Sequence, residues 1–139
     1  MKTAGRKRKP AGLADLARLA AVARQRAYAP YSRFKVGAAL RTKAGEIVTG
    51  CNIENASYGL TLCAERVAVF KAVSEGLREF DAIAVVADSP RPTAPCGPCR
   101  QILWEFCGDI VVVMQDTGGR KRTLRMSELL PLPFDRRNL

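Results

Sequence analysis

The sequence predicts an α/β fold in which helices cover both faces of a mixed five-stranded sheet. Three observations predict it: an amphipathic helical pattern opens the chain, a β-hairpin pattern follows, and buried strands then alternate with helices. With 139 residues, of which 47% are hydrophobic and 26% charged, the chain has the size and composition of one globular domain. We therefore expect residues 11–139 to form a single domain.

The first part of the chain is predicted to form a helix and a hairpin. Apolar residues recur at helical spacing in the first segment, and they alternate with the period of a strand in the segment that follows. Pro30 separates the two patterns, because its ring pushes the preceding residue into an extended conformation. The expected elements are a helix from Leu13 to about Ala27, a strand from Tyr31 to Thr42 and a second strand from Ile47 to Glu54.

The second part alternates helices with strands. Residues 83–86 form a continuous apolar run, typical of a strand that is covered on both faces. Gly76 is a natural end for the helix that precedes this strand. The expected elements are helices over 62–75 and 98–107, strands over 81–88, 110–114 and 120–125, and a short helix that starts at Ser127 and ends before Pro131.

Three cysteines and one glutamate form the most informative pattern in the chain. Cys63 and Glu65 lie at the start of one predicted helix, and Cys96 and Cys99 lie at the start of the next. Thiolates are preferred zinc ligands, and three protein ligands leave the fourth tetrahedral position open for water. Glu65 is better suited to moving protons than to holding metal. The pattern therefore predicts one catalytic zinc ion per chain.

Three thiolates around zinc carry a net negative charge, which must be offset before bound water can ionise readily. Helix N-termini supply a partial positive charge beside Cys63 and Cys99. Arg66 follows Cys63 by three residues, so its guanidinium lies on the same helix face and can donate hydrogen bonds to the sulfur. Cys63 and Glu65 are ~200° apart around a regular helix, so both can face only a pocket that lies beyond the helix end.

Other interpretations of the cysteines remain open at this point. A Cys-x-x-Cys pair alone is also typical of redox proteins. Cys107 is ~12 Å along the helix from Cys99, which makes it a poor fourth ligand for a structural zinc site. Cys51 is expected in the core, where free cysteine is common. Together with the Cys-x-Glu pair and the flanking Pro95, the pattern is the signature of zinc-dependent deaminases.

Four stretches of the chain resemble the small, tetramer-forming cytidine deaminases. The resemblance runs from about Leu13 to Phe134, and it implies a three-layer α/β/α cytidine-deaminase-like fold. It also implies hydrolytic deamination of cytidine and 2′-deoxycytidine to the uridines, with release of ammonia and with Glu65 moving the protons. The stretches are YSRFKVGAAL at 31–40, NIENASY at 52–58, CAER at 63–66 and PCGPCRQ at 95–101.

The same resemblance implies roles for the residues around the substrate. Stacking against the ring falls to Phe34, and binding of the ribose falls to Asn52 and Glu54. The backbone of Ala64 is expected to meet the edge of the pyrimidine. Two further aromatic residues, Tyr58 and Phe134, are expected to come from neighbouring subunits of a homotetramer with shared active sites.

Each of these assignments has an alternative. Phe34 and Phe134 are also of a type that fills cores and interfaces, and polar residues such as Asn52 and Glu54 are often only solvated.

The function as a whole also has alternatives. A related deaminase of aminonucleoside antibiotics is the nearest alternative enzyme. A zinc-stabilised nucleic-acid-binding module is the alternative from another class. Superfamily members that act on polynucleotides usually place histidine where Cys63 stands, so the three cysteines favour a free nucleoside.

The formal net charge of +10 owes half of its value to residues 1–10. This basic stretch is expected to be a disordered, solubilising tail, and specific nucleic-acid binding is the less favoured interpretation.

No apolar run approaches the ~20 residues of a membrane span. The five cysteines, an odd number, argue against a disulfide framework and favour the cytoplasm.

Overall fold

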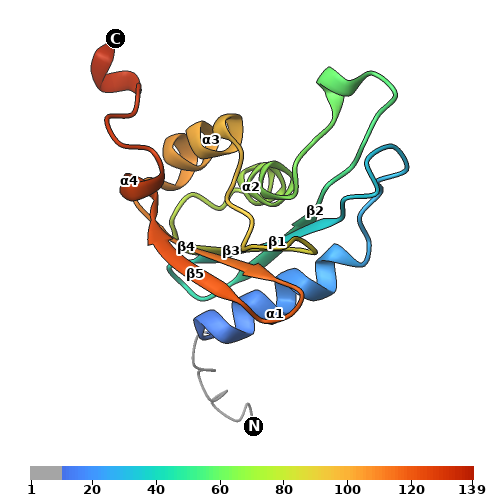
Figure 1. The fold of residues 1–139 in the computed structure, drawn as a ribbon. Helices are drawn as coiled ribbons and strands as arrows, with labels where there is room; N and C mark the ends of the chain where they lie inside the picture. The colour runs from blue at the N-terminus through green and yellow to red at the C-terminus, as the bar shows by residue number, and fades with distance from the viewer. Residues whose placement is uncertain (1–10) are drawn as a thin grey trace, which may run out of the picture.

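A mixed five-stranded sheet with helices on both faces forms the body of the protein (Figure 1). The structure, a computed structural model, describes residues 11–139, so the expected basic tail lies outside the described residues. The strand order is β2-β1-β3-β4-β5, and only β3 and β4 run parallel. The elements are α1 (Leu13–Arg24), β1 (Val36–Thr42), β2 (Ile47–Cys51), α2 (Ala64–Ser74), β3 (Phe80–Ala87), α3 (Gly97–Cys107), β4 (Val111–Asp116), β5 (Lys121–Arg125) and α4 (Met126–Leu129), with single 3₁₀ turns at Tyr58–Leu60 and Arg136–Asn138.

The predicted fold class is confirmed, and the central strand shows why its apolar run is continuous. Alternate residues of β3 point to opposite faces, so Ile83 and Val85 pack in the core under α2 and α3. Ala84 and Val86 pack in a second core, against Leu16 and its neighbours on α1. A strand that is covered on both faces has no position for a polar side chain.

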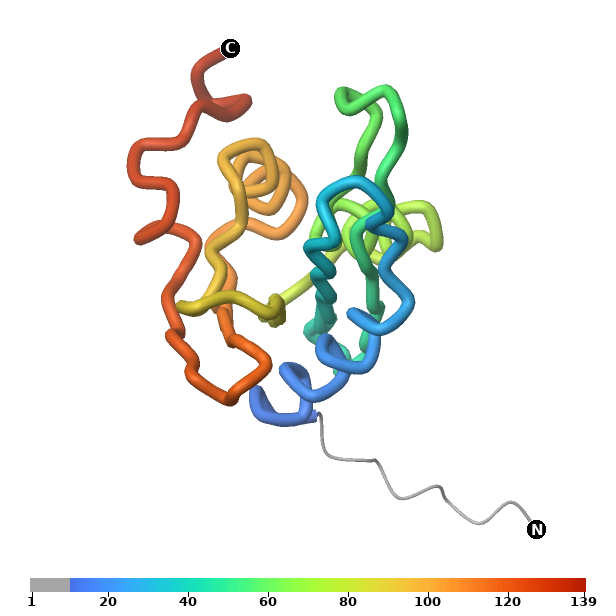
Figure 2. The backbone as a smooth tube through the Cα atoms, turned by 45° about the vertical axis from the view of Figure 1, so that its right-hand side comes forward, coloured from blue at the N-terminus to red at the C-terminus, as the bar shows by residue number. Residues whose placement is uncertain are grey.

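The hairpin strands are shorter than the sequence predicts. Residues 31–35 and 52–54 leave the sheet, except for single bridges that Ile53 forms with Tyr28 and Leu62. The expected strand bounds, Tyr31 to Thr42 and Ile47 to Glu54, are therefore wrong at these two ends, and Phe34, Asn52 and Glu54 lie outside the strands. The two segments instead form neighbouring loops that project beyond the sheet (Figures 1 and 2).

Two helix starts meet beyond the sheet, as the positions of the cysteines predict. Cys63 is the N-cap residue of α2, and Cys96 is the N-cap residue of α3. Pro98 lies in the first turn of α3, where its missing N–H would have had no partner within the helix. The two helices pack side by side on one face of the sheet (Figure 1).

Gly50 sets the distance between β2 and the first turns of α2. A Cβ atom at this position would lie 2.5 Å from the carbonyl oxygen of Ala64 and 2.6 Å from the backbone nitrogen of Ala68. Any side chain here would push the helix, together with its N-terminal residues, away from the sheet.

None of the helices in residues 11–139 combines the length and the apolar character that crossing a bilayer requires.

We predict that Gly50→Ala lowers the free energy of unfolding by about 1–3 kcal/mol, because the extra methyl group must displace backbone atoms of α2. Chemical denaturation followed by circular dichroism measures this loss. The matched control is Gly59→Ala, since a Cβ at Gly59 meets no atom within 4 Å. Equal stability of the two variants would show that α2 is not held at its minimum distance from β2.

Candidate metal centre and the adjoining cavity

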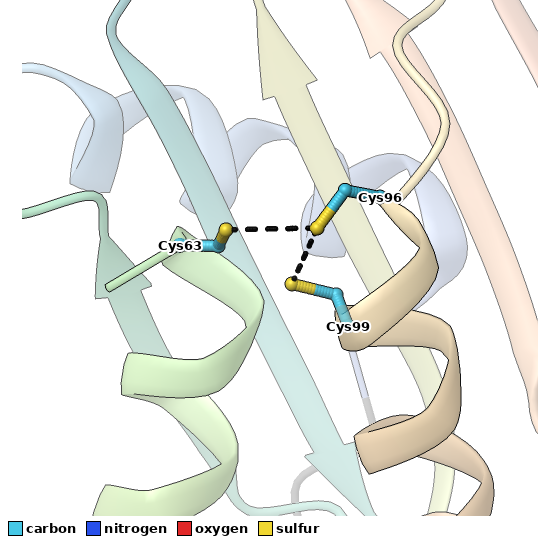
Figure 3. A group of neighbouring side chains, drawn as sticks. All are labelled: Cys63, Cys96 and Cys99. Atoms are coloured by element: carbon cyan, nitrogen blue, oxygen red, sulfur yellow. Dashed lines mark hydrogen bonds between the residues drawn. The ribbon is translucent and has the colours of Figure 1, made fainter. Parts of the chain in front are cut away.

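Three sulfur atoms come together where α2 and α3 begin (Figure 3). The Sγ atoms of Cys63, Cys96 and Cys99 all lie within 4.8 Å of one another. The Cys63–Cys96 pair is 3.8 Å apart and the Cys96–Cys99 pair 3.3 Å. Sulfurs at the corners of a zinc tetrahedron, each ~2.3 Å from the metal, lie ~3.8 Å apart, so the three thiols fit this ion.

The cluster is made by three of the five cysteines. Cys51 and Cys107 are free and lie outside it, and within residues 11–139 these three cysteines are the one group of potential ligands close enough to share an ion. Burial raises the pKa of the Cys107 thiol to about 12, which keeps it protonated and unsuited to metal binding. A closed four-cysteine structural site is therefore absent from the described residues, and a bound zinc ion would have three cysteine ligands.

Positive charge surrounds Cys63. Arg66 Nη2 donates a hydrogen bond to Cys63 Sγ at 3.3 Å and another to the Thr61 carbonyl oxygen at 3.2 Å. The neighbouring Cys99 thiol and the Arg66 guanidinium stabilise the thiolate form and lower the pKa of Cys63 to about 5. The Cys63 thiolate and burial raise the pKa of Cys99 in turn. Even without metal, Cys63 is therefore a thiolate at neutral pH.

Glu65 lies beside the sulfurs and faces a cavity. Only 4% of the residue is exposed, and burial raises the pKa of its carboxyl group. Glu65, Cys63 and Cys96 all line one cavity of ≈ 180 Å³, which lies off the end of α2 as the helical geometry predicts. A buried carboxyl group with a raised pKa is suited to taking up and releasing a proton near neutral pH.

The cavity gathers most of the residues that were expected to bind substrate. Both loops beyond the hairpin contribute to its wall, and so does the first turn of α2. A second, outer cavity of ≈ 380 Å³ shares Ser32, Glu54 and Thr61 with it and adds Tyr31 and Tyr58. The expected residues in the wall of the inner cavity are Phe34, Asn52, Glu54 and Ala64.

Glu54 fastens the loop that carries Phe34. Its Oε1 accepts hydrogen bonds from the backbone N–H groups of Tyr31 at 2.9 Å and Ser32 at 3.0 Å, and its Oε2 accepts one from Ser32 Oγ. Ser32 Oγ then accepts the Phe34 N–H at 3.0 Å. The hydrogen bonds from Ser32 lower the pKa of Glu54, so this carboxylate stays ionised. Ser32 was missed by the sequence analysis, although it precedes Phe34 in the same motif.

Asn52 fastens the other end of this loop. Its Oδ1 accepts the Val36 N–H at 2.8 Å, and its Nδ2 donates to the Phe34 carbonyl oxygen at 2.8 Å. The residue is 8% exposed, and its backbone N–H donates to the Val36 carbonyl oxygen at 3.2 Å, so backbone and side chain together extend the hairpin pairing by one residue beyond Cys51. An amide group has four hydrogen-bonding positions, so one N–H and one lone pair remain for a ligand.

Tyr58 and Phe134 stand apart from the inner cavity. Tyr58 is 74% exposed and rests edge-on against Tyr31, with the ring centroids 5.9 Å apart. Phe134 is 62% exposed and lines neither cavity of its own chain. It belongs to the C-terminal segment, which projects beyond α3 (Figure 1) and is tied to it by a hydrogen bond from Gln101 Nε2 to the Phe134 carbonyl oxygen at 2.7 Å.

Comparison with known proteins agrees with this geometry. Residues 12–115 match the family described as the cytidine and deoxycytidylate deaminase zinc-binding region. The cytidine deaminase of Halalkalibacterium halodurans is 58% identical over 113 residues, which cover 81% of this chain and 86% of the relative. The cytidine deaminase of Sporosarcina psychrophila is 51% identical over 118 residues, covering 84% of this chain and 87% of the relative.

A solved structure shares the architecture as well as the sequence. The crystal structure of cytidine deaminase from Burkholderia pseudomallei superposes with a TM-score of 0.86 at 48% identity. The match covers 89% of this chain and all of that one. The predicted resemblance, the fold class and the zinc cofactor are thereby confirmed.

We predict that zinc binding to the metal-free protein at neutral pH releases fewer than three protons per ion. Cys63, with a pKa of about 5, has already lost its proton before the metal arrives. Arg66→Gln removes the hydrogen bond to Cys63 Sγ, so it should raise the number of protons released. Calorimetric titration in buffers of different ionisation enthalpy counts them.

The matched control is Arg78→Gln, because Arg78 bonds the Val73 carbonyl oxygen at 2.7 Å near the opposite end of α2. This variant should release as many protons as the unmodified chain. If Arg66→Gln behaves in the same way, the guanidinium does not stabilise the thiolate.

Proposed function

The chain belongs to the cytidine and deoxycytidylate deaminase family, and we propose that it deaminates cytidine and 2′-deoxycytidine to uridine and 2′-deoxyuridine, releasing ammonia. One observation carries this proposal: three thiols with zinc spacing and a buried carboxyl group share one cavity. Relatives that cover most of the chain are cytidine deaminases. Zinc held by Cys63, Cys96 and Cys99 would supply an activated water molecule to the cavity.

Glu65 moves the protons. It is the one titratable group in the wall of the inner cavity, apart from the cysteines and Glu54, and Glu54 is held ionised by the loop. Burial favours the neutral form of Glu65, so a proton taken from water rests there at little cost. The carboxyl group gives this proton to the ring nitrogen. It then takes a second proton, from the hydroxyl group that has been added to the ring carbon, and passes it to the amine, which leaves as ammonia.

The remaining residues hold the nucleoside. Phe34 offers a ring for stacking, and the backbone of Ala64, in the first turn of α2, meets the pyrimidine edge. Glu54 accepts hydrogen bonds from sugar hydroxyls with the lone pairs that the loop leaves unused, and Asn52 adds its remaining donor and acceptor. Among residues 11–139 no Lys or Arg lines either cavity, and Glu54 is negative, so a neutral nucleoside is favoured over a 5′-phosphate.

We propose that the working unit is a homotetramer with shared sites. Both cavities open to solvent in the single chain, and exposed aromatic rings stand at their rim and on the C-terminal segment. Tyr58 and Phe134 of neighbouring chains would close the cavity, and exclusion of water strengthens the electrostatic interactions inside it.

Residues 1–10 remain proposed as a solubilising tail. Free cysteines support a cytoplasmic location. Deamination of free nucleosides would serve pyrimidine salvage.

The proposed activity predicts a definite order of substrates. Cytidine and 2′-deoxycytidine should both be deaminated, whereas cytosine lacks the hydroxyl groups that Glu54 and Asn52 bind and cytidine 5′-monophosphate brings repulsive charge. Ultraviolet absorbance of the four reactions, run side by side, measures this. Equal rates on cytosine and cytidine would refute the proposal.

In the same assay, Glu65→Gln should keep its zinc and its melting temperature while turnover falls by about 10²–10⁴-fold, since the amide cannot carry the proton. Elemental analysis checks the metal. Near-normal turnover in this variant would place the proton transfer elsewhere.

Shared sites make a separate prediction. Phe134→Ala should raise the Michaelis constant by about two- to tenfold while leaving zinc content unchanged, because a stacking contact is lost. Mixing this chain with Glu65→Gln chains should restore low-KM activity, since some sites then combine Glu65 from one chain with Phe134 from another.

The matched control mixes Phe134→Ala with a chain that carries both substitutions and has no ring to lend. Recovery there, or full activity of a protein that light scattering shows to be monomeric, would contradict shared sites.

A further inference from the structure

A separate cavity of ≈ 520 Å³ lies between the segment that follows β3 and the strands β4 and β5. In Figure 2 this segment reaches toward β5 before it turns back to α3. Thr93 and Ala94 line this cavity on one side and the inner nucleoside cavity on the other. Its volume is within the range of sites for small ligands.

The charge of this cavity is opposite to that of the nucleoside cavities. Three arginines, Arg91, Arg100 and Arg122, line it, and none of its lining residues is acidic. None of the three forms an ion pair within residues 11–139, where the five ion pairs use other arginines. Residues 1–10 contain no Asp or Glu, so they cannot supply a carboxylate counter-charge.

Arg100 is fixed in place, partly buried, at the wall. Its Nε donates to the Pro95 carbonyl oxygen and its Nη1 to the Leu129 carbonyl oxygen, both at 2.8 Å. Carbonyl groups satisfy these donors but leave the positive charge uncompensated. A guanidinium held in one orientation loses little freedom when it binds an anion.

Hydroxyl groups complete the wall. Ser89 Oγ and Thr93 Oγ1 lie 2.8 Å apart, and Ser89 Oγ also bonds the Arg91 carbonyl oxygen. Pro90 and Pro92 restrict the backbone of this segment, so Arg91 and the two hydroxyls are carried on a stiff support. The two hydroxyl groups thus brace the segment, and the cavity presents cationic donors on a backbone that needs little ordering.

We propose that this cavity binds a phosphate group, either free or carried by a small nucleotide. Guanidinium groups match the oxygens of phosphate in charge and geometry, and three of them suit a dianion better than the single charge of a carboxylate. This site is distinct from the metal centre, and it goes beyond the deamination proposed above.

The test is direct binding to the zinc-loaded full-length chain by isothermal titration calorimetry. The probes are inorganic phosphate, adenosine 5′-triphosphate and acetate. Phosphate or the nucleotide should bind and acetate should not, and the tighter of the first two identifies the source of the group. Arg91→Gln/Arg122→Gln should weaken binding at least about tenfold, because hydrogen bonds between charged partners are lost.

Two control variants distinguish binding in this cavity from binding at another place on the chain. Lys43→Gln/Arg136→Gln removes the same charge from exposed positions elsewhere and should leave the dissociation constant unchanged. Phe34→Ala alters the nucleoside cavity and should also leave it unchanged, which excludes stacking of the nucleotide base in that cavity. Equal weakening by the first control, loss in Phe34→Ala, binding of acetate as strong as that of phosphate, or no binding of either phosphate probe would overturn the proposal.

Discussion

The structure depends on two helix N-termini that meet at a cluster of thiols. Cys63 is the N-cap residue of α2, Cys96 is the N-cap residue of α3 and Cys99 lies in the first turn of α3, so the sulfurs lie at the positive ends of two helix dipoles. Those partial charges, together with Arg66, stabilise the thiolate form of Cys63 at a pH where an isolated cysteine would keep its proton. The close packing of α2 on β2 at Gly50 keeps this arrangement in register with the sheet.

The second constraint is the loop that carries Phe34. Asn52 and Glu54 follow the end of β2, and both use part of their hydrogen-bonding capacity on backbone groups of residues 31–36. The same side chains face the cavity. If Asn52 and Glu54 also bind the sugar, as proposed, they couple the shape of the cavity to sugar recognition. A substitution at either position therefore alters the placement of Phe34 as well as the contact with a hydroxyl group, and its effect on binding combines the two.

Sequence reasoning recovered the parts of this protein that depend on local pattern. Apolar periodicity gave the order of helices and strands, and ligand chemistry gave the three cysteines. It failed where side chains replace backbone pairing: nothing in the period of residues 31–42 shows that Asn52 ends the hairpin by bonding the backbone on both sides of Lys35. Ser32 was missed for the same reason, because its importance comes from a contact with Glu54, 22 residues away. The arginine-lined cavity also depends on distant contacts, since Arg91 and Arg122 come together only when the segment after β3 reaches β5.

The distribution of charge links these features. In the part of the chain that the structure describes, the inner cavity is lined by ionised Glu54 and by no basic residue. The cavity beyond Thr93 and Ala94 is lined by three arginines and by no acidic residue. Hydrogen bonds to the backbone hold both charges in place. The Glu54 carboxylate accepts them from the N–H groups of Tyr31 and Ser32. The Arg100 guanidinium donates them to the carbonyl oxygens of Pro95 and Leu129. A ligand with a neutral polar end and an anionic end is therefore sorted by its charge. The neutral nucleoside would bind on the side that holds the metal centre, and the proposed phosphate group would bind on the other. One short segment, which ends at the metal-binding pair Cys96 and Cys99, separates the two environments. Pro90, Pro92 and Pro95 make this segment stiff. The Glu54 carboxylate, which repels a phosphate group, therefore stays on one side of the segment, and the guanidinium groups that attract phosphate stay on the other.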